Sequence, residues 1–255
     1  MDFFPKAALL ILAGAIAGIM NALAGGGTLL TFPSLVLAGL PTISANATST
    51  VALLIGVGSS IFGYRRELST QKEWAIRFAI PSLLGGIVGA VLLLNTEESH
   101  FRAVVPFLIL FAATLFTFQK QILRLLEIET HALEHSRHAM AVAMLFQVGV
   151  AIYGGYFGAG IGILMLASLG VLMGAQNVLE INSVKVTQAF LINITAAVIF
   201  IASGKVYWVE AAMIAIGAGC GGMAGPWIGR RVGPKVVRWF VSVLGFGVGI
   251  IMLLR

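Results

Sequence analysis

The chain has 255 residues and a net charge of +6, from 16 Lys and Arg against 10 Asp and Glu. Only 10% of its residues are charged and 59% are hydrophobic, whereas a soluble domain carries about 25% charged residues. This composition excludes a soluble protein. The lone cysteine, Cys220, excludes a disulfide within the chain.

Long stretches of the chain carry no charge, and the longest runs from Lys6 to Arg65. Because a helix of about 20 apolar residues crosses a bilayer, this stretch alone can supply about three crossings. The second and seventh of the hydrophobic segments are short, which predicts half-helices or re-entrant pieces. We therefore expect an all-α, polytopic transmembrane helical bundle in a lipid bilayer. Its ten segments lie near 7–24, 28–40, 46–64, 75–94, 103–119, 139–155, 159–174, 183–203, 208–228 and 237–254.

The first five segments resemble the last five, which indicates an internal duplication. The matching positions keep a separation of 133–136 residues. They pair Gly25 with Gly158, Gly26 with Gly160, Gly27 with Gly162 and Asn46 with Asn182. We divide the chain accordingly into a first transmembrane repeat (1–119), a cytoplasmic linker helix (120–138) and a second transmembrane repeat (139–255).

Equivalent loops of the two halves carry opposite charge bias. Residues 65–77 hold four basic residues and their counterpart, 203–210, holds only Lys205. The next pair reverses this, since 230–238 is basic and 95–102 holds only Arg102. Because cytoplasmic loops are enriched in Lys and Arg, the pattern predicts inverted-topology repeats with both termini outside the cytoplasm.

Two Gly-rich breaks, AGGGTLLTFPS (24–34) and YFGAGIGILM (156–165), each lead into a short apolar helix. A helix N-terminus presents free N–H groups and a partial positive charge. Two such ends that meet at the repeat interface would hold an anion. The alternative is close helix packing through small residues.

Polar side chains crowd the openings of the third and eighth segments, NATST and NSVK. Uncharged amides and hydroxyls such as Asn46, Thr48, Ser49 and Asn182 can donate to an oxyanion without holding it too tightly for release. Their alternative role is hydrogen bonding between helices. Lys185 lies within the eighth segment, where a charge is costly, and it aligns with Ser49 of the first half. It binds an anion, pairs with Glu180 or snorkels to the interface.

Other features predict packing or solvation. Gly221, Gly225 and Gly229 form a small-residue stripe typical of a helix-packing face. The three histidines His131, His135 and His138 lie among charged residues, and we interpret them as part of the solvated linker helix. We expect no metal site and no cofactor. The spans contain neither a Walker motif nor a nucleophile–base set, so we expect a protein that is not an enzyme.

Several segments together resemble the TauE/SafE family, also described as sulfite exporter or DUF81-type membrane proteins. They are GIMNALAGGGTLLTFPSLVLAGLPTISANATSTVALLIG, GYFGAGIGILMLASLGV, NSVKVTQAFLINITAAVIF and GCGGMAGPWIGRRV. The resemblance covers nearly the whole chain. It implies a bacterial or archaeal inner-membrane protein that exports a sulfur-containing anion such as sulfite, or a sulfonate such as sulfoacetate.

We therefore expect a secondary transporter that exports a small anion by alternating access between two inverted repeats. The alternatives are an anion channel and a non-transporting membrane scaffold subunit. We expect no nucleic-acid partner, and a homodimer is compatible with the sequence. The expected substrate site is formed by Gly25, Gly26, Gly27, Asn46, Thr48, Ser49, Gly158, Gly160, Gly162, Asn182 and Lys185.

Overall fold

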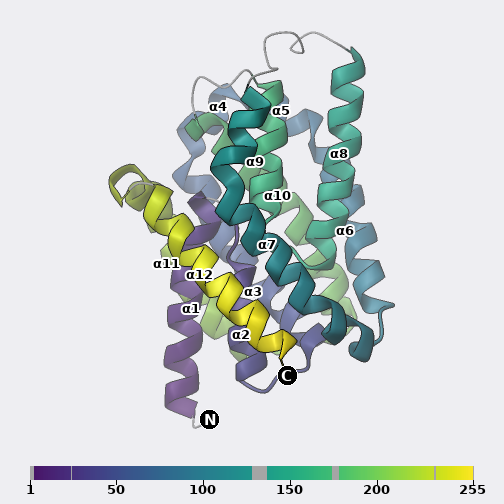
Figure 1. Ribbon diagram of the computed structural model, residues 1–255, viewed down its shortest axis with the longest axis vertical. Coiled ribbons are helices and arrows are strands. Elements are labelled where there is room, and N and C mark those ends of the chain that lie inside the picture. Colours follow the sequence, from purple (N-terminus) through teal and green to yellow (C-terminus); the bar gives the residue numbers. More distant parts are fainter. Residues whose placement is uncertain (1–2, 24, 128–136, 174–177, 233, 255) are drawn as a thin grey trace.

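The computed structural model describes residues 3–23, 25–127, 137–173, 178–232 and 234–254, and within these ranges it contains helices and no strand (Figure 1). The first half holds α1 (Phe3–Leu23), α2 (Thr28–Leu37), α3 (Thr42–Gly63), α4 (Arg65–Thr70), α5 (Lys72–Arg77), α6 (Ala79–Leu94) and α7 (Glu98–Glu127). The second half holds α8 (Arg137–Tyr156), α9 (Ile161–Leu172), α10 (Val178–Ala202), α11 (Trp208–Val232) and α12 (Pro234–Leu253).

Helices are the expected response to a bilayer, because a spanning segment must satisfy its backbone hydrogen bonds internally. Within the described part of the chain, six helical stretches are long and apolar enough to cross a membrane. They are Phe3–Leu23, Thr42–Gly63, Lys72–Leu94, Glu98–Phe118, Leu179–Ala202 and Trp208–Gly225. The prediction of an all-α, multi-pass bundle is confirmed.

Each of the ten predicted segments is helical, and the two short ones are the short helices α2, with 10 residues, and α9, with 12. The boundaries differ most at the fifth segment, which lies inside the 30-residue α7. The helix continues past the apolar stretch to Glu127, into the range expected for the linker helix. Residues 128–136, with His131 and His135, lie outside the described residues, as does the side chain of His138.

The breaks after α1 and α8 are built in the same way. The Gly25 N–H donates to the Met20 carbonyl at 2.9 Å, and the Gly158 N–H donates to the Tyr153 carbonyl at 3.2 Å, each five residues back. Both glycines have positive φ, 75° and 80°. Residues with a Cβ atom rarely adopt a positive φ, so a glycine at each position allows the chain to leave one helix and start the next.

The matching helices α3 and α10 run in opposite directions. Glu180, near the start of α10, accepts a 2.7 Å hydrogen bond from Gln71, which follows the end of α3 by way of α4. At the other end, the N–H of Tyr207, which follows α10, donates to Thr48 near the start of α3 at 3.0 Å. Opposite directions are what inverted repeats require. The inverted repeat and the domain boundaries remain predictions.

Helices from different halves pack most closely. α1 packs along α11, and α6 packs along α8. An ideal Cβ on Gly221 would lie 2.0 Å from the Ala15 carbonyl oxygen, and one on Gly225 would lie 2.5 Å from the Ala22 Cβ. The packing role predicted for the glycine stripe is therefore confirmed for Gly221 and Gly225.

Candidate functional site

The two Gly-rich breaks touch each other inside the molecule. An ideal Cβ on Gly25 would lie 2.6 Å from the Gly162 Cα, so the two backbones are in direct contact. The Cβ position of Gly158 is 3.6 Å from the Thr28 hydroxyl oxygen, at the first residue of α2. The starts of α2 and α9 therefore meet where the two halves join, as the sequence predicts.

The start of α9 presents backbone donors at this contact. Among the described residues, no hydrogen bond from the N–H groups of Ile161 and Gly162 is present. Unpaired N–H groups at a helix start carry the positive end of the helix dipole, which favours a nearby anion. Gly162 is also the residue that Gly25 touches.

The remaining glycines of the two breaks have packing or hydrogen-bonding roles. An ideal Cβ on Gly26 would overlap the Phe116 ring at 2.2 Å, and one on Gly160 would lie 3.1 Å from the Ala112 Cβ, both in α7. The Gly27 N–H donates to the Asn21 amide oxygen at 2.8 Å. Close packing thus explains why these positions are small, and it does not conflict with a site at Gly25 and Gly162.

Lys185 reaches the end of α1 beside this contact. Its side chain is buried, with a relative exposure of 1%, which rules out snorkelling. The ammonium donates to the carbonyls of Asn21 and Ala22, both at 3.4 Å. Glu180 bonds to Gln71 instead, and no described carboxylate forms an ion pair with Lys185.

Asn46 of the first half makes the corresponding contact with the end of α8 in the second half. Its amide nitrogen donates to the carbonyl of Tyr156, the last residue of α8, at 3.0 Å. Its amide oxygen is buried and finds no donor among the described residues, and the same holds for the amide oxygen of Asn182. A buried acceptor without a donor costs about 1–3 kcal/mol, so both oxygens would gain from a ligand or water that donates.

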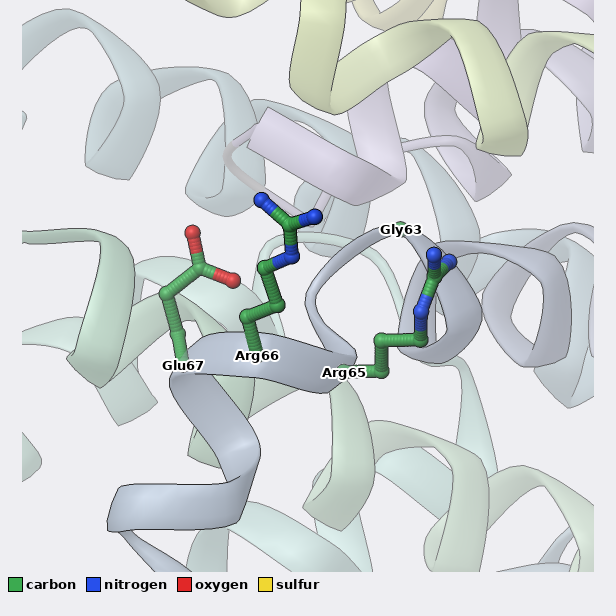
Figure 2. A pocket seen from close by; sticks show the side chains of 4 residues that line it. All are labelled: Gly63, Arg65, Arg66 and Glu67. Carbon is green, nitrogen blue, oxygen red and sulfur yellow. The ribbon is translucent and has the colours of Figure 1, made fainter.

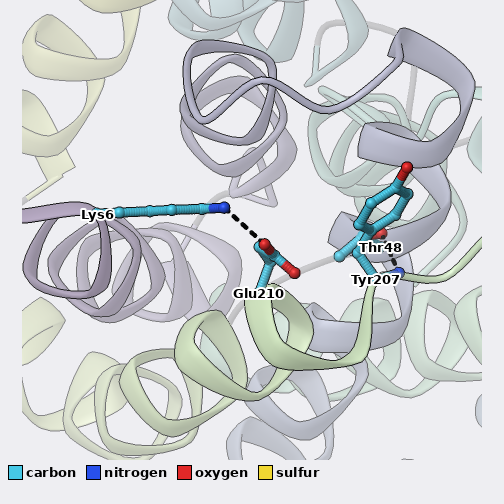
Figure 3. Close-up of polar contacts among 4 residues, drawn as sticks. All are labelled: Lys6, Thr48, Tyr207 and Glu210. Atoms are coloured by element: carbon cyan, nitrogen blue, oxygen red, sulfur yellow. Dashed lines mark hydrogen bonds and ion pairs between the residues drawn. The ribbon is translucent and has the colours of Figure 1, made fainter. Parts of the chain in front are cut away.

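The two hydroxyl candidates bond between helices. Ser49 shares a 2.6 Å hydrogen bond with Thr31 of α2, one turn into the helix that follows the first break. Thr48 turns instead toward the start of α11, where it accepts from the Tyr207 N–H (Figure 3). The structure therefore brings Ser49 near the breaks and directs Thr48 away from them.

Sequence reasoning missed the residues that complete this region. Asn21 contributes both its side chain and its carbonyl, and Tyr64 donates from its hydroxyl to the Ala22 carbonyl at 3.2 Å. Asn21 directly precedes ALAGGG, a position that could have marked it. Tyr64 lies more than 40 residues from Ala22, and no local pattern indicates the contact.

Two other polar features lie away from the breaks. Lys6 of α1 and Glu210 of α11 form a 2.7 Å ion pair near the start of both helices (Figure 3). An open pocket of about 240 Å³ is lined by Gly63, Arg65, Arg66 and Glu67 where α3 turns into α4 (Figure 2). The pocket belongs to the basic loop 65–77, at the opposite end of α3 from Thr48.

The chain is similar to a family of known membrane proteins. A family model described as sulfite exporter TauE/SafE matches residues 10–252. The chain belongs to the TauE/SafE family. Within a family of membrane transporters, its apolar helices make it a multi-pass membrane protein.

Three curated relatives cover most of this TauE/SafE chain. The probable membrane transporter protein ORF9 of Sinorhizobium sp is 26% identical over 98% of this chain and 93% of its own length. A probable membrane transporter protein of Haemophilus influenzae is 25% identical over 94% and 91%. Probable membrane transporter protein YfcA of Escherichia coli K12 is 24% identical over 90% and 82%. No solved structure matches the chain.

Proposed function

We propose that this TauE/SafE protein is a secondary transporter that exports a small anion, sulfite or an organosulfonate such as sulfoacetate, by alternating access. The observation that carries the proposal is the meeting of the two helix breaks at Gly25 and Gly162. The family's description as sulfite exporters supports the substrate class.

The chemistry around the breaks suits a transported anion. Lys185 supplies a positive charge and the start of α9 supplies unpaired N–H groups. Lys185 holds only two carbonyls, at the long distance of 3.4 Å, and it has no carboxylate partner among the described residues. A buried cation with such weak partners gains from an anionic ligand.

Export of an anion needs no coupled ion. A membrane potential that is negative inside favours the exit of each negative charge by about 2.3 kcal/mol per 100 mV. The proposed export therefore relies on charge, helix ends and movement.

The test is flux of sulfite out of liposomes that contain the purified protein. We expect efflux that saturates with internal sulfite and accelerates when the potential is negative inside. Flux that never saturates and far exceeds the turnover of a carrier would show that the protein is the alternative, an anion channel. A purified protein that gives no flux for any anion would favour the scaffold alternative.

Ligand-dependent thermal stabilisation tests the substrate class independently. The panel is sulfite, sulfate, thiosulfate, short sulfonates and carboxylates. A ligand at 100 times its dissociation constant stabilises the protein by about 2.7 kcal/mol. We expect shifts for sulfite or sulfonates, and shifts confined to carboxylates would contradict the proposed substrate.

The proposed orientation in a cell inner membrane, with both termini outside the cytoplasm, is tested by thiol labelling. Cys220 is exposed and is first replaced, as Cys220→Ser. Ser69→Cys lies in the basic loop 65–77 and Ser203→Cys in the loop after α10, and both positions are exposed. An impermeant reagent applied from the periplasmic side should label Ser203→Cys only. Labelling of Ser69→Cys alone would reverse the orientation.

A further inference from the structure

The close packing of the molecule does not follow its two sequence halves. α11 packs against α1 and α3, and α6 packs against α8 and α10. Each group thus takes two helices from one half and its third helix from the other. We call α1, α3 and α11 the first bundle, and α6, α8 and α10 the second bundle.

Contacts within the first bundle join backbone to backbone. An ideal Cβ on Gly217 would lie 2.0 Å from the Ile11 carbonyl oxygen, and one on Gly222 would lie 2.2 Å from the Gly56 carbonyl oxygen. The hydroxyl of Ser59 donates from α3 to the Gly219 carbonyl in α11 at 3.1 Å. Backbones packed this closely, with a hydrogen bond between α3 and α11, favour movement of α1, α3 and α11 together.

The second bundle is joined in the same manner. An ideal Cβ on Gly89 would lie 2.1 Å from the Ile152 carbonyl oxygen, and one on Gly155 would lie 2.3 Å from the Gly86 carbonyl oxygen. Gln147 of α8 donates to the Ser82 hydroxyl of α6 at 2.9 Å. α10 joins α6 at Gly86, where an ideal Cβ would lie 2.9 Å from the Ile192 carbonyl oxygen. Both bundles therefore contain close contacts between backbones.

The contact between the bundles is different. α3 faces α10, where the Cβ position of Gly58 is 3.4 Å from the Phe190 ring, an ordinary contact with a side chain. Among the described residues, two hydrogen-bonded contacts join helices of different bundles at the helix breaks, in addition to the links at the ends of α3 and α10 described above. They are Lys185 of α10 on the end of α1, and Asn46 of α3 on the end of α8.

We infer that transport moves these two exchanged bundles against each other, with α3 and α10 as the sliding surface and the Lys185 and Asn46 contacts as the links that change. This inference rests on the proposed function. It differs from the movement of one sequence half against the other, because α11 moves with the first half and α6 with the second. A bound anion would act where the bundles are linked, since Lys185 holds the end of α1 beside the breaks.

Cross-linking of paired cysteines tests which helices move together. The protein carries Cys220→Ser, and flux is measured in liposomes before and after a short bifunctional thiol reagent. One pair, Gly58→Cys with Phe190→Cys, joins the two bundles. The control pair is Ile55→Cys with Gly219→Cys. Ile55 lies on α3 one turn from Gly58, and the pair joins α3 to α11, since the Cβ position of Gly219 is 3.4 Å from the Ile55 side chain.

We expect the α3–α10 cross-link to reduce flux at least tenfold and cleavage of the linker to restore it. The α3–α11 cross-link should leave flux within twofold. Loss of flux with the α3–α11 cross-link would overturn the inference, because the sequence halves would then be moving units, while the proposed transport by alternating access would stand. Full flux with both cross-links would instead overturn alternating access itself.

Discussion

Replacing Lys185 with methionine separates a substrate role from a structural one. Methionine is close to lysine in length and removes the charge and the donor. A lysine at the centre of a membrane helix costs about 2.5–3.5 kcal/mol. Lys185 recovers part of this through its two carbonyl contacts, and an average hydrogen bond contributes about 0.5–1.5 kcal/mol.

The cost of burying the lysine exceeds the energy of its two hydrogen bonds, so the substituted protein should be more stable. Two hydrogen bonds at 3.4 Å are long, so their contribution lies near the lower end of that range. The Ala22 carbonyl also keeps its hydrogen bond from Tyr64 after the substitution. We therefore expect Lys185→Met to stabilise the protein by about 1.5–2.5 kcal/mol, which raises the Tm of a domain of this size by about 3–10 °C.

Flux should respond in the opposite way, because the anion loses its positive partner. We expect Lys185→Met to fold, to show a higher Tm in detergent and to lose sulfite flux. Lys205→Met is the matched control, since Lys205 is exposed in the loop after α10, and it should change neither Tm nor flux. A Lys185→Met protein with a lower Tm and full flux would show that Lys185 only caps α1, and the reasoning would be refuted.

Two further substitutions test the packing and the capping of helices. Gly221→Ala should lower stability by about 1–3 kcal/mol, because the new methyl group meets a backbone oxygen at 2.0 Å, while Gly247→Ala, with open space at its Cβ, should raise it by up to about 1 kcal/mol; equal Tm changes for the two would contradict the packing. Glu98→Ala should cost about 1.5–3 kcal/mol, because the Glu98 carboxylate accepts from the N–H and the hydroxyl of Thr42 at the start of α3. Its neighbour Glu97 contacts only exposed groups, so Glu97→Ala should stay within about 0.5 kcal/mol in the same Tm measurement.

The sequence predicts the helices well because the bilayer leaves few choices. Apolar stretches without charge must become helices, and glycines with neighbouring polar residues mark where they break. The short helices α2 and α9 and the breaks at Gly25 and Gly158 follow from this. Boundaries were less predictable: α7 extends to Glu127, since a helix does not need apolar residues once it leaves the membrane.

The partners of the polar side chains were not predictable, because they depend on contacts between distant helices. Glu180 is five residues from Lys185, yet Gln71 reaches it from the loop after α4. Thr48 lies one residue from Ser49, and on a helix neighbouring residues point in different directions. Thr48 therefore faces Tyr207 while Ser49 faces Thr31.

α6 and α11 each pack with helices of the other half, and the two halves also supply polar partners for each other's helix ends. α2 and α9 are too short to cross a bilayer, and the last carbonyls of α1 and α8, which precede them, have no partner within their own helix. Lys185 and Asn46 satisfy those ends, and each comes from the other half of the chain. The two links differ in charge, because Asn46 is neutral and Lys185 is a cation without a carboxylate partner among the described residues. An anion at the breaks would therefore weaken the charged link at α1 more than the neutral link at α8.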